Sequence, residues 1–374
     1  MKKSVLLGTT ALVAAGMMAG DALAADPVSL SVGGYYRNAF VQILDEADGD
    51  GQGGDGFQDS FIKQDVEVHF LGETTLDNGL TVGVNIQLEA QTNADQIDET
   101  WAYISGSWGQ LRVGVEDGVA YNFGYIGPYA GNFGQFTPYF TMTNIGNTAG
   151  FISPTGGSQY NTNFSVHNFY DGDSPRLYYT TPDFNGFQLG VSYAPDTTED
   201  TNSPVVDSSI GGVSNLWDVA IGYSGEFSGV SVGLSGGYSH YHFDTTTIDP
   251  ESWSVGANFG FGNWTLGGHY GEADGDTGGT LELEVWDVGL KYASGAWAVA
   301  LGYSQGDWGA AGSGLQDDEL SSLVLGVDYS MGPGISLGGA VSYNDLDNNA
   351  EFNGGAVLPD ANDIAVGVSL TVDY

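Results

Sequence analysis

A strict alternation of apolar with small or polar residues constrains this chain more than any other feature. The stretch DIAVGVSLTVDY (363–374) keeps this alternation up to its last residue. Its apolar set is Ile364, Val366, Val368, Leu370, Val372 and Tyr374. A period of two belongs to a β-strand with one apolar face and not to a helix. Because chain ends are usually poorly ordered, an apolar strand in this position needs a partner strand.

The same alternation recurs along most of the sequence and predicts sixteen strands. The predicted segments are 29–44, 60–75, 80–91, 95–106, 109–117, 175–182, 186–195, 215–225, 229–243, 250–261, 263–273, 281–293, 296–306, 318–331, 334–345 and 361–374. Seven connections are tight and carry the Gly, Asn, Asp and Pro residues of β-turns. Most of the others are longer and rich in Gly and Asp. Short turns that alternate with long loops indicate an antiparallel up-and-down meander.

The two strand faces differ in a way that favours a membrane barrel over a soluble sandwich. The polar face consists mostly of Gly, Ser and other small residues, whereas the apolar face carries aromatic residues near the strand ends. Examples are Trp217 and Tyr223, Trp264 and Tyr270, and Trp297 and Tyr303. Apolar residues toward lipid, polar residues toward the lumen and aromatic rings at both interfaces are the pattern of transmembrane β-barrels.

A sheet that spans lipid must close, because unpaired backbone groups in hydrocarbon cost several kcal/mol each. The strand 361–374 must therefore pair with the strand 29–44. The predicted fold class is all-β: a transmembrane antiparallel up-and-down barrel of sixteen strands, wide enough for an aqueous channel.

Residues 1–24 have the composition of a secretory signal peptide. Lys2 and Lys3 precede an apolar stretch, and Ala22-Leu23-Ala24 forms a small-x-small cleavage site. The stretch is too short for a membrane helix, and no later run reaches the required ~18 to 20 apolar residues. We therefore expect a signal peptide at 1–24 and one barrel domain at 25–374.

The composition excludes some functions. Without residues 1–24 the chain has 46 acidic and 5 basic residues and no cysteine. Nucleic-acid binding requires basic surfaces and is therefore excluded. Disorder, the other common reading of such acidity, does not fit the 18 Phe, 21 Tyr and 8 Trp. With no disulfide bonds, backbone pairing and packing must stabilise the fold.

Several stretches resemble the Gram-negative general porins, in particular those of the alphaproteobacterial type. They are SVGGYYRNAF in the first strand, GSWGQLRVG (106–114), SPRLYYTTPDFNGFQLGVSYA (174–194) and the terminal strand, which ends in Tyr374 where the family most often has Phe. The resemblance implies an integral protein of the outer membrane, exported through its signal peptide and in contact with lipid and lipopolysaccharide. It also implies a homotrimer in which each barrel has its own pore, narrowed by the third long loop (118–174).

Strand parity places all five remaining basic residues on the lumen face. Avoidance of lipid, where a charge costs about 2–4 kcal/mol at mid-depth, is sufficient to explain this placement. The resemblance implies more for Arg37, Lys63, Arg112 and Arg176: they would face acidic residues of the third loop across a constriction. The predicted pore-lining residues are Arg37, Lys63, Glu67, His69, Arg112, Glu116, Asp117, Arg176, Asp171, Asp173, Tyr121, Phe123 and Tyr125.

The sequence departs from the family at this constriction. Where relatives often carry another Arg after LRVG, this chain has Val115, Glu116 and Asp117. The third loop has no acidic or basic residue from 118 to 170 apart from His167, and it contains thirteen aromatic residues. So long a loop is usually functional or disordered, and its aromatic content argues against disorder. We expect it to fold into the barrel mouth, with rings that pack on the wall or line a path for sugars.

Acidic loops raise the question of a metal. The stretch LDEADGDGQGGDG resembles the start of an EF-hand, but Phe57 stands where that motif needs a bidentate Glu, so an EF-hand is rejected. A looser calcium site stays open as an alternative to a solvated loop. Its candidate ligands are Asp45, Glu46, Asp48, Asp50 and Asp55. No other cofactor is expected.

The leading hypothesis is a passive diffusion pore for small hydrophilic solutes and ions, with a weak preference for cations, and not an enzyme. The acidic loops would enrich cations at its mouth. One alternative is a sugar-selective channel with an aromatic constriction loop. Others are a structural or adhesive barrel or a barrel enzyme such as a lipase, and a soluble β-sandwich fits least.

Overall fold

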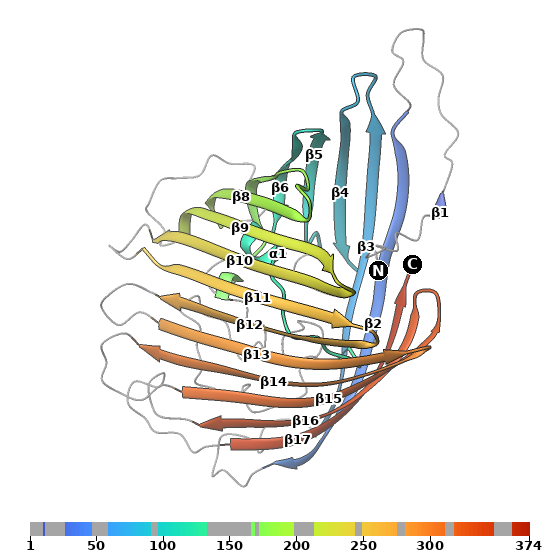
Figure 1. Ribbon diagram of the computed structural model, residues 1–374, viewed down its shortest axis with the longest axis vertical. Coiled ribbons are helices and arrows are strands. Elements are labelled where there is room, and N and C mark those ends of the chain that lie inside the picture. The colour runs from blue at the N-terminus through green and yellow to red at the C-terminus, as the bar shows by residue number, and fades with distance from the viewer. Residues whose placement is uncertain are drawn as a thin grey trace.

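The computed structural model describes residues 10–11, 27–46, 59–90, 96–132, 166–168, 172–197, 213–243, 249–274, 281–310, 318–347 and 361–374. Sixteen long strands carry almost all of its regular structure (Figure 1). They are β2 (Ser29–Glu46), β3 (Ser60–Thr75), β4 (Thr81–Glu89), β5 (Thr100–Gly106), β6 (Gly109–Glu116), β7 (Ser174–Thr180), β8 (Phe187–Asp196), β9 (Val213–Phe227), β10 (Val230–Phe243), β11 (Glu251–Phe261), β12 (Trp264–Asp274), β13 (Leu281–Ser294), β14 (Trp297–Ala310), β15 (Asp318–Gly332), β16 (Ile335–Asp347) and β17 (Ala361–Asp373). Each predicted strand is confirmed within a few residues.

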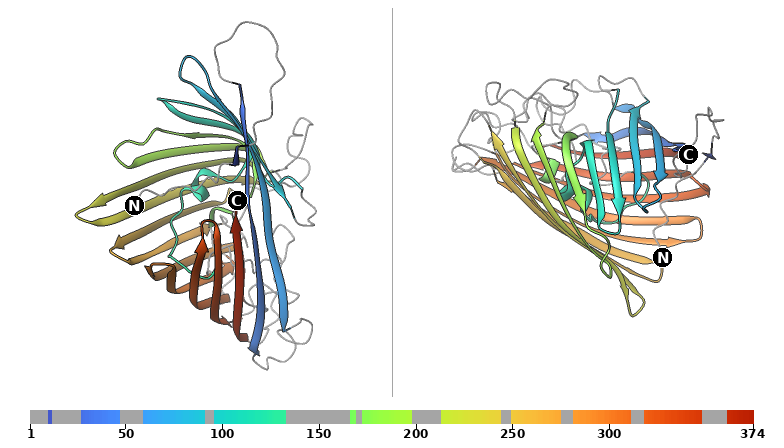
Figure 2. Two further views of the ribbon diagram at one scale, coloured as in Figure 1. Left: turned by 90° about the vertical axis from the view of Figure 1, so that its right-hand side faces the viewer. Right: turned by 90° about the horizontal axis from the view of Figure 1, so that it is seen from above.

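The sheet is a closed antiparallel barrel. Every strand from β2 to β17 pairs with its neighbours in sequence, and β17 pairs with β2. At the closing seam Val372 lies opposite Tyr36, and the backbone groups of Tyr374 and Gly34 exchange two hydrogen bonds of 3.0 Å. The terminal strand thus has the partner that its apolar face requires. Figure 2 shows the strands wrapping around a common interior.

A further two-residue strand, β1 (Thr10–Ala11), pairs with Val32 and Ser31 of β2. It belongs to the segment predicted as a signal peptide, which stays a prediction. In the part of the chain that the structure describes, no helix is long and apolar enough to cross a membrane.

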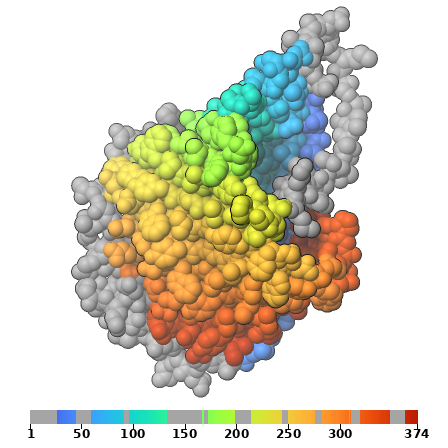
Figure 3. Space-filling model, viewed as in Figure 1, coloured from blue at the N-terminus to red at the C-terminus, as the bar shows by residue number. Residues whose placement is uncertain are grey.

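The polarity of the barrel is inverted relative to a soluble protein. Large apolar side chains such as Ile62, Leu177 and Leu325 are 72, 50 and 51% exposed on the outer face. On the inner face of neighbouring strands Ser304 and Asp287 are buried, with 0 and 4% exposure. This arrangement suits an outer surface in lipid and a polar interior. In Figure 3 the strands from β8 to β17 form one continuous outer surface.

Aromatic pairs between neighbouring strands mark both ends of the barrel. Trp264 packs on Tyr292 and Trp297 on Tyr329 beside the short turns, with ring centroids 4.7 and 4.6 Å apart. At the long-loop end Tyr193 packs on Trp217 at 4.4 Å. Such cross-strand pairs stabilise the sheet, and the two rows match the aromatic girdles that flank the apolar band of membrane barrels.

Beyond the girdle at the long-loop end, the outer face of β12 to β16 becomes acidic. The strand register places carboxylates directly opposite one another on successive strands, in the order Glu272, Glu284, Asp307, Glu319 and Asp347. We call these five residues the carboxylate row. On the opposite face of the same strand ends Leu283, Leu320 and Leu346 are buried. The sheet therefore reverses its polarity where it leaves the apolar band.

Candidate pore constriction

A segment of the predicted third loop lies inside the barrel. It begins with helix α1 (Val119–Asn122), whose residues Val119 and Ala120 are buried. The preceding Gly118 is extended, and the Val119 amide donates a 3.1 Å hydrogen bond to Oγ of Ser192 on β8. Figures 1 and 2 show α1 and the trace that follows it on the concave side of the sheet.

Hydrogen bonds anchor residues 118–132, which we call the loop segment, to the inner wall. The amides of Tyr125 and Gly127 donate to Oγ of Ser235 and Oδ1 of Asp287, at 2.9 and 2.5 Å. The remaining anchors are Gly131 N to Asp328 Oδ1 at 2.8 Å, Asn132 Nδ2 to Thr371 Oγ1 at 2.5 Å, and Ser369 Oγ to Gly131 O at 2.9 Å. The segment thus follows the inner wall from β8 to β17. Residues 133–165 and 169–171 lie outside the described residues, so the course of the whole loop stays a prediction.

Inner-wall glycines make room for the loop segment. A Cβ on Gly326 would lie 2.0 Å from the carbonyl oxygen of Ala130, and one on Gly256 would lie 2.1 Å from that of Tyr125. Because real Cβ atoms do not approach so closely, any larger residue would push the segment away from the wall. The abundance of Gly on the lumen face therefore has a structural reason.

A second described piece of the loop, η2 (Val166–Asn168), packs on β10 and β11. His167 is 4% exposed, and its ring nitrogens lie 2.8 Å from Oγ of Ser239 and 2.7 Å from Oγ of Ser254. Burial lowers the pKa of His167, and the nearby His269 lowers it further. The imidazole is therefore uncharged at neutral pH, and its hydrogen bonds connect η2 to β10 and β11.

Two of the predicted wall arginines pair with acids of the wall. Arg37 Nη1 lies 3.2 Å from Oδ2 of Asp65 on the adjacent strand. Arg176, only 3% exposed, lies 3.1 Å from Oδ2 of Asp218 and donates from Nη2 to the carbonyl oxygen of Gly172, also at 3.1 Å. These two ion pairs lie within the wall, and Arg176 also holds the end of the loop through a carbonyl, while the expected pairing with acids of the loop stays a prediction.

Arg112 is held on the wall of β6. Its guanidinium forms an ion pair with Glu116, four residues further along the same strand. It also donates a hydrogen bond from Nε to Gln110 Oε1 at 2.6 Å. The guanidinium carbon lies 4.4 Å from the ring centroid of Trp101 and 4.8 Å from that of Tyr178. Cation–π contacts of this kind fix the side chain in one position.

The predicted residues of β3 all lie on its inner side. Glu67 is 7% exposed and accepts hydrogen bonds from Tyr35 and from His69, the latter at 2.6 Å. Lys63 Nζ lies 5.4 Å from the ring centroid of Phe61. These side chains form a polar strip beside the Arg37–Asp65 pair.

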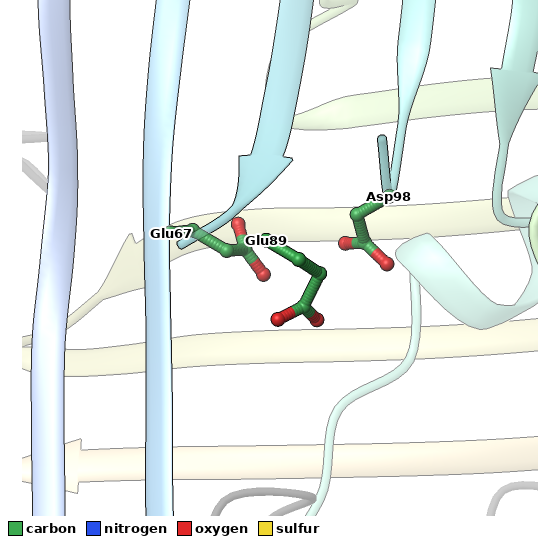
Figure 4. Close-up of side chains that lie close together, drawn as sticks. All are labelled: Glu67, Glu89 and Asp98. Carbon is green, nitrogen blue, oxygen red and sulfur yellow. The ribbon is translucent and has the colours of Figure 1, made fainter. Parts of the chain in front are cut away.

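Two groups of carboxylates could hold a cation. Ligand oxygens of Glu67, Glu89 and Asp98 lie within 4.8 Å of one another, and the three side chains converge in Figure 4. Glu99, Asp117 and Asp173 form the second group within the same limit. Burial raises the pKa of Glu99, and the charges of Asp173 and Glu116 add to the rise.

The predicted aromatic residues lie on the loop segment. Tyr121 is half-buried in α1. The Phe123 ring lies against Gly190 and Gly222, and the Tyr125 ring lies against Gly233. Phe123 and Tyr125 therefore pack on the wall, as one interpretation of the loop proposed.

The remaining predicted residues fall partly or wholly outside the described structure. Asp171 lies outside it, as do Asp48, Asp50 and Asp55 of the candidate calcium loop. Asp45 and Glu46 end strand β2, and their side chains are not among those described. The calcium site of this loop thus stays a prediction.

The acidic residues of the site that sequence reasoning missed include Glu99, Asp218, Asp287 and Asp328. A signal was present for three of them, because Asp218, Asp287 and Asp328 share the polar parity of their strands. An acid at such a position must face the lumen. Glu99 lies within the predicted strand 95–106 and shares the parity of Trp101 and Tyr103, although the observed strand β5 begins only at Thr100.

Two cavities lie in the interior on the short-turn side of the loop segment. The first has a volume of about 520 Å³, and Arg112, Glu116, Asn122, Phe123 and Tyr178 line it together with Ser, Thr and Gln residues of β5 to β8. The second has about 590 Å³ and lies below Tyr125 and Pro128, against β9 to β12. The segment therefore divides the interior without filling it.

A closed barrel of sixteen strands with an apolar outer face, a polar interior and a loop segment on the inner wall defines an outer-membrane channel protein. The family model for Gram-negative porins matches residues 8–349, which is most of the chain. The chain belongs to the Gram-negative porin family. It resides in the outer membrane as an integral β-barrel. No curated protein matches the sequence.

Solved structures of distant relatives share the fold. OmpT of Vibrio cholerae, folded in vitro and in trimer form, has 12% identity and a TM-score of 0.63 over 93% of this chain and 100% of that chain. An anion-selective porin from Comamonas acidovorans has 17% identity and a TM-score of 0.61, with the same coverage. The channel DcaP of Acinetobacter baumannii has 15% identity and a TM-score of 0.58, over 93% of this chain and 98% of that chain.

Proposed function

We propose that this porin lets small hydrophilic solutes and ions diffuse passively across the outer membrane, with a weak preference for cations. The observation that carries the preference is an excess of carboxylates beside the loop segment. Arg112 and Arg176 pair with Glu116 and Asp218, and the further carboxyl groups of Asp117 and Asp173 lie together nearby. A narrow, polar passage of one charge sign enriches ions of the opposite sign.

Planar-bilayer recording tests this proposal. Stepwise insertion of open channels is expected, and the reversal potential in a KCl gradient should indicate potassium preference. An Asp173→Asn variant should move the reversal potential toward zero. A control that changes the same charge elsewhere, Asp249→Asn at the exposed end of β11, should leave it unchanged. Anion preference of the wild type, or absence of conductance, would refute the proposal.

The assembly and the absence of enzymatic activity are also proposals. The trimer form of OmpT of Vibrio cholerae supports a homotrimer, and the apolar outer face supports contact with lipid and lipopolysaccharide. Native mass spectrometry in detergent tests the trimer. A lipase assay on purified channels tests for enzymatic activity, and none is expected.

The sugar-selective alternative has one observation in its favour. Phe123 and Tyr125 lie on the wall next to the two interior cavities, and exposed rings are common platforms for sugars. Liposome swelling separates the two functions: linear uptake of a neutral sugar supports diffusion, and saturation supports selective binding.

A further inference from the structure

The first interior cavity contains a buried acceptor that lacks a donor. Glu116 is 5% exposed, and its Oε1 accepts from Arg112 and from Asn122 Nδ2. Its Oε2 is buried and has no hydrogen-bond partner among the described residues. A buried carboxylate oxygen in this state is stabilised by any donor that enters the cavity.

The groups around Glu116 are held in fixed positions. Arg112 is fixed by Gln110 and by the rings of Trp101 and Tyr178. On the other side Phe123 is fixed by the wall glycines against which its ring lies. The cavity therefore offers a carboxylate held in place beside aromatic surface, which limits the reorganisation that precedes ligand binding.

The charge around the cavity selects the kind of donor. The carboxyl groups of Glu116, Asp117, Asp173 and Asp218 outnumber the two nearby arginines, Arg112 and Arg176. An ammonium group satisfies Oε2 and reduces this excess of negative charge, whereas a neutral hydroxyl satisfies the oxygen alone. Aromatic rings beside the carboxylate also attract a cation.

The volume of the first cavity and its neutral lining residues indicate what the rest of the ligand should be. A volume of about 520 Å³ lies within the range of small-molecule sites. Ser105, Gln110, Thr180 and Gln188 line the cavity with neutral hydrogen-bonding groups. A polar body with several hydroxyl groups matches this lining better than an alkyl chain does.

We propose that this cavity is a binding subsite of the pore for small, hydroxylated solutes that carry a protonated primary amine, with the ammonium group on Glu116 Oε2. The subsite rests on the proposed function as a channel and deepens it. A solute held there slows its own passage, so its flux saturates, while simple ions pass around it.

Glucosamine and glucose form a matched pair of probes, because they differ in one amine and hardly in size. Each is added on the short-turn side of single channels in KCl at about pH 6.5, where a primary amine with an ordinary pKa is protonated. Binding appears as concentration-dependent current fluctuations that yield a dissociation constant. Glucosamine is expected to bind, and glucose and N-acetylglucosamine are expected to bind about tenfold or more weakly.

Variants assign the binding to the cavity. Glu116→Gln should weaken glucosamine binding about tenfold, because the amide replaces one charged acceptor. Glu226→Gln, which makes the same charge change in the second cavity, should leave binding unchanged. Equal loss in both variants would show only a general effect of lumen charge and would overturn the subsite.

The remaining outcomes are also decisive. Equal binding of glucose and glucosamine to the wild type would overturn the proposed ligand class, and it does so even if Glu116→Gln fails to assemble. No binding of either probe would overturn the subsite. The KCl conductance recorded before each addition tests the channel itself, so failure of the subsite and failure of the channel are distinguishable.

Discussion

The amide of Gly127 donates a 2.5 Å hydrogen bond to Oδ1 of Asp287 and ties the loop segment to β13 across 160 positions of sequence. Asp287 is 4% exposed, so water cannot readily replace the carboxylate. Removal of the acceptor in Asp287→Ala should destabilise the anchored segment by about 1.5–3 kcal/mol, the usual range for a hydrogen bond to a charged group. Single-channel current noise should rise, and Asp287→Asn, which keeps an acceptor oxygen, should stay close to the wild type. Current noise at the wild-type level in Asp287→Ala would contradict the role of Asp287 as an anchor of the loop segment.

The wall glycines predict a steric effect on pore width. Gly326→Ala places a methyl group 2.0 Å from the Ala130 carbonyl oxygen, so the loop segment must move away from the wall. We expect an altered single-channel conductance and a melting temperature lower by several degrees, since overpacking costs about 1–3 kcal/mol. Gly332→Ala is the control, because nothing lies within 4 Å of that added methyl group. Equal conductance in both variants would show that the position of the loop segment does not depend on the contact between Gly326 and Ala130.

The two arginine–aspartate pairs should differ in their contribution to stability. The side chains of Arg176 and Asp218 are 1 and 3% exposed, whereas those of Arg37 and Asp65 are 17 and 19% exposed. Asp218→Ala leaves a buried arginine without its carboxylate, which costs about 3–5 kcal/mol. Asp65→Ala should cost about 1 kcal/mol, because solvent reaches and screens this partly exposed pair. Urea unfolding in lipid vesicles measures the free energy of unfolding of both variants. A larger loss of stability in Asp65→Ala than in Asp218→Ala would contradict the prediction.

Glu99 should make stability depend on pH. Burial and the neighbouring Asp173 and Glu116 raise the pKa of Glu99 above its unfolded value. The protonated form therefore stabilises the folded state at low pH, and this contribution is lost as pH rises from the ordinary Glu range of about 4.3 through the raised pKa. Glu99→Gln should melt like the wild type near about pH 4 and at a higher temperature above neutrality. A thermal series across pH checks this, and Glu226→Gln serves as an exposed control. A Glu99→Gln variant that is less stable at high pH would show that the carboxylate is needed there.

The carboxylate row should make the barrel sensitive to ionic strength. Like charges directly opposite one another on neighbouring strands are destabilising, and Glu284 has such a neighbour on both sides. Glu284→Gln should raise the melting temperature at low salt, and the gain should shrink near about 1 M NaCl, where the screening length is about 3 Å. Glu251→Gln, outside the row, should gain less. A gain that persists at high salt would point to a cause other than charge.

The strands and the inverted polarity follow from local pattern, and for that reason they could be predicted. The period of two assigns each residue to a face, and the small residues on one face together with the aromatic ends of the other indicate which side meets lipid. This parity was sufficient to place Arg37, Lys63, Arg112 and Arg176 in the lumen. The closure of the last strand on the first also follows, because a spanning sheet cannot leave an edge unpaired.

The partners within the lumen could not be predicted in the same way. Which residues meet across the barrel depends on strand stagger and on the path of the loop, and neither is encoded in the alternation. Arg176 thus reaches Asp218 two strands away, and Gly127 reaches Asp287. The resemblance to the porins implied that the arginines face acids of the loop, which stays a prediction, and the strand pattern gave no sign of the pairs Arg37–Asp65 and Arg176–Asp218 within the wall. The periodic glycines of the lumen face were visible in the sequence. Their contacts with the backbone of Ala130 and Tyr125 could not be predicted, because these contacts depend on the path of the loop.

The seam between Tyr374 and Gly34 bears on how such a molecule is made. The seam joins β2 to β17, which are the first and the last of the sixteen long strands, so the ring closes only when both are in place. A barrel that lacks one strand would expose two unpaired strand edges to the hydrocarbon. Closure of the barrel therefore depends on β17, because β17 is the strand that covers the edges of both β16 and β2.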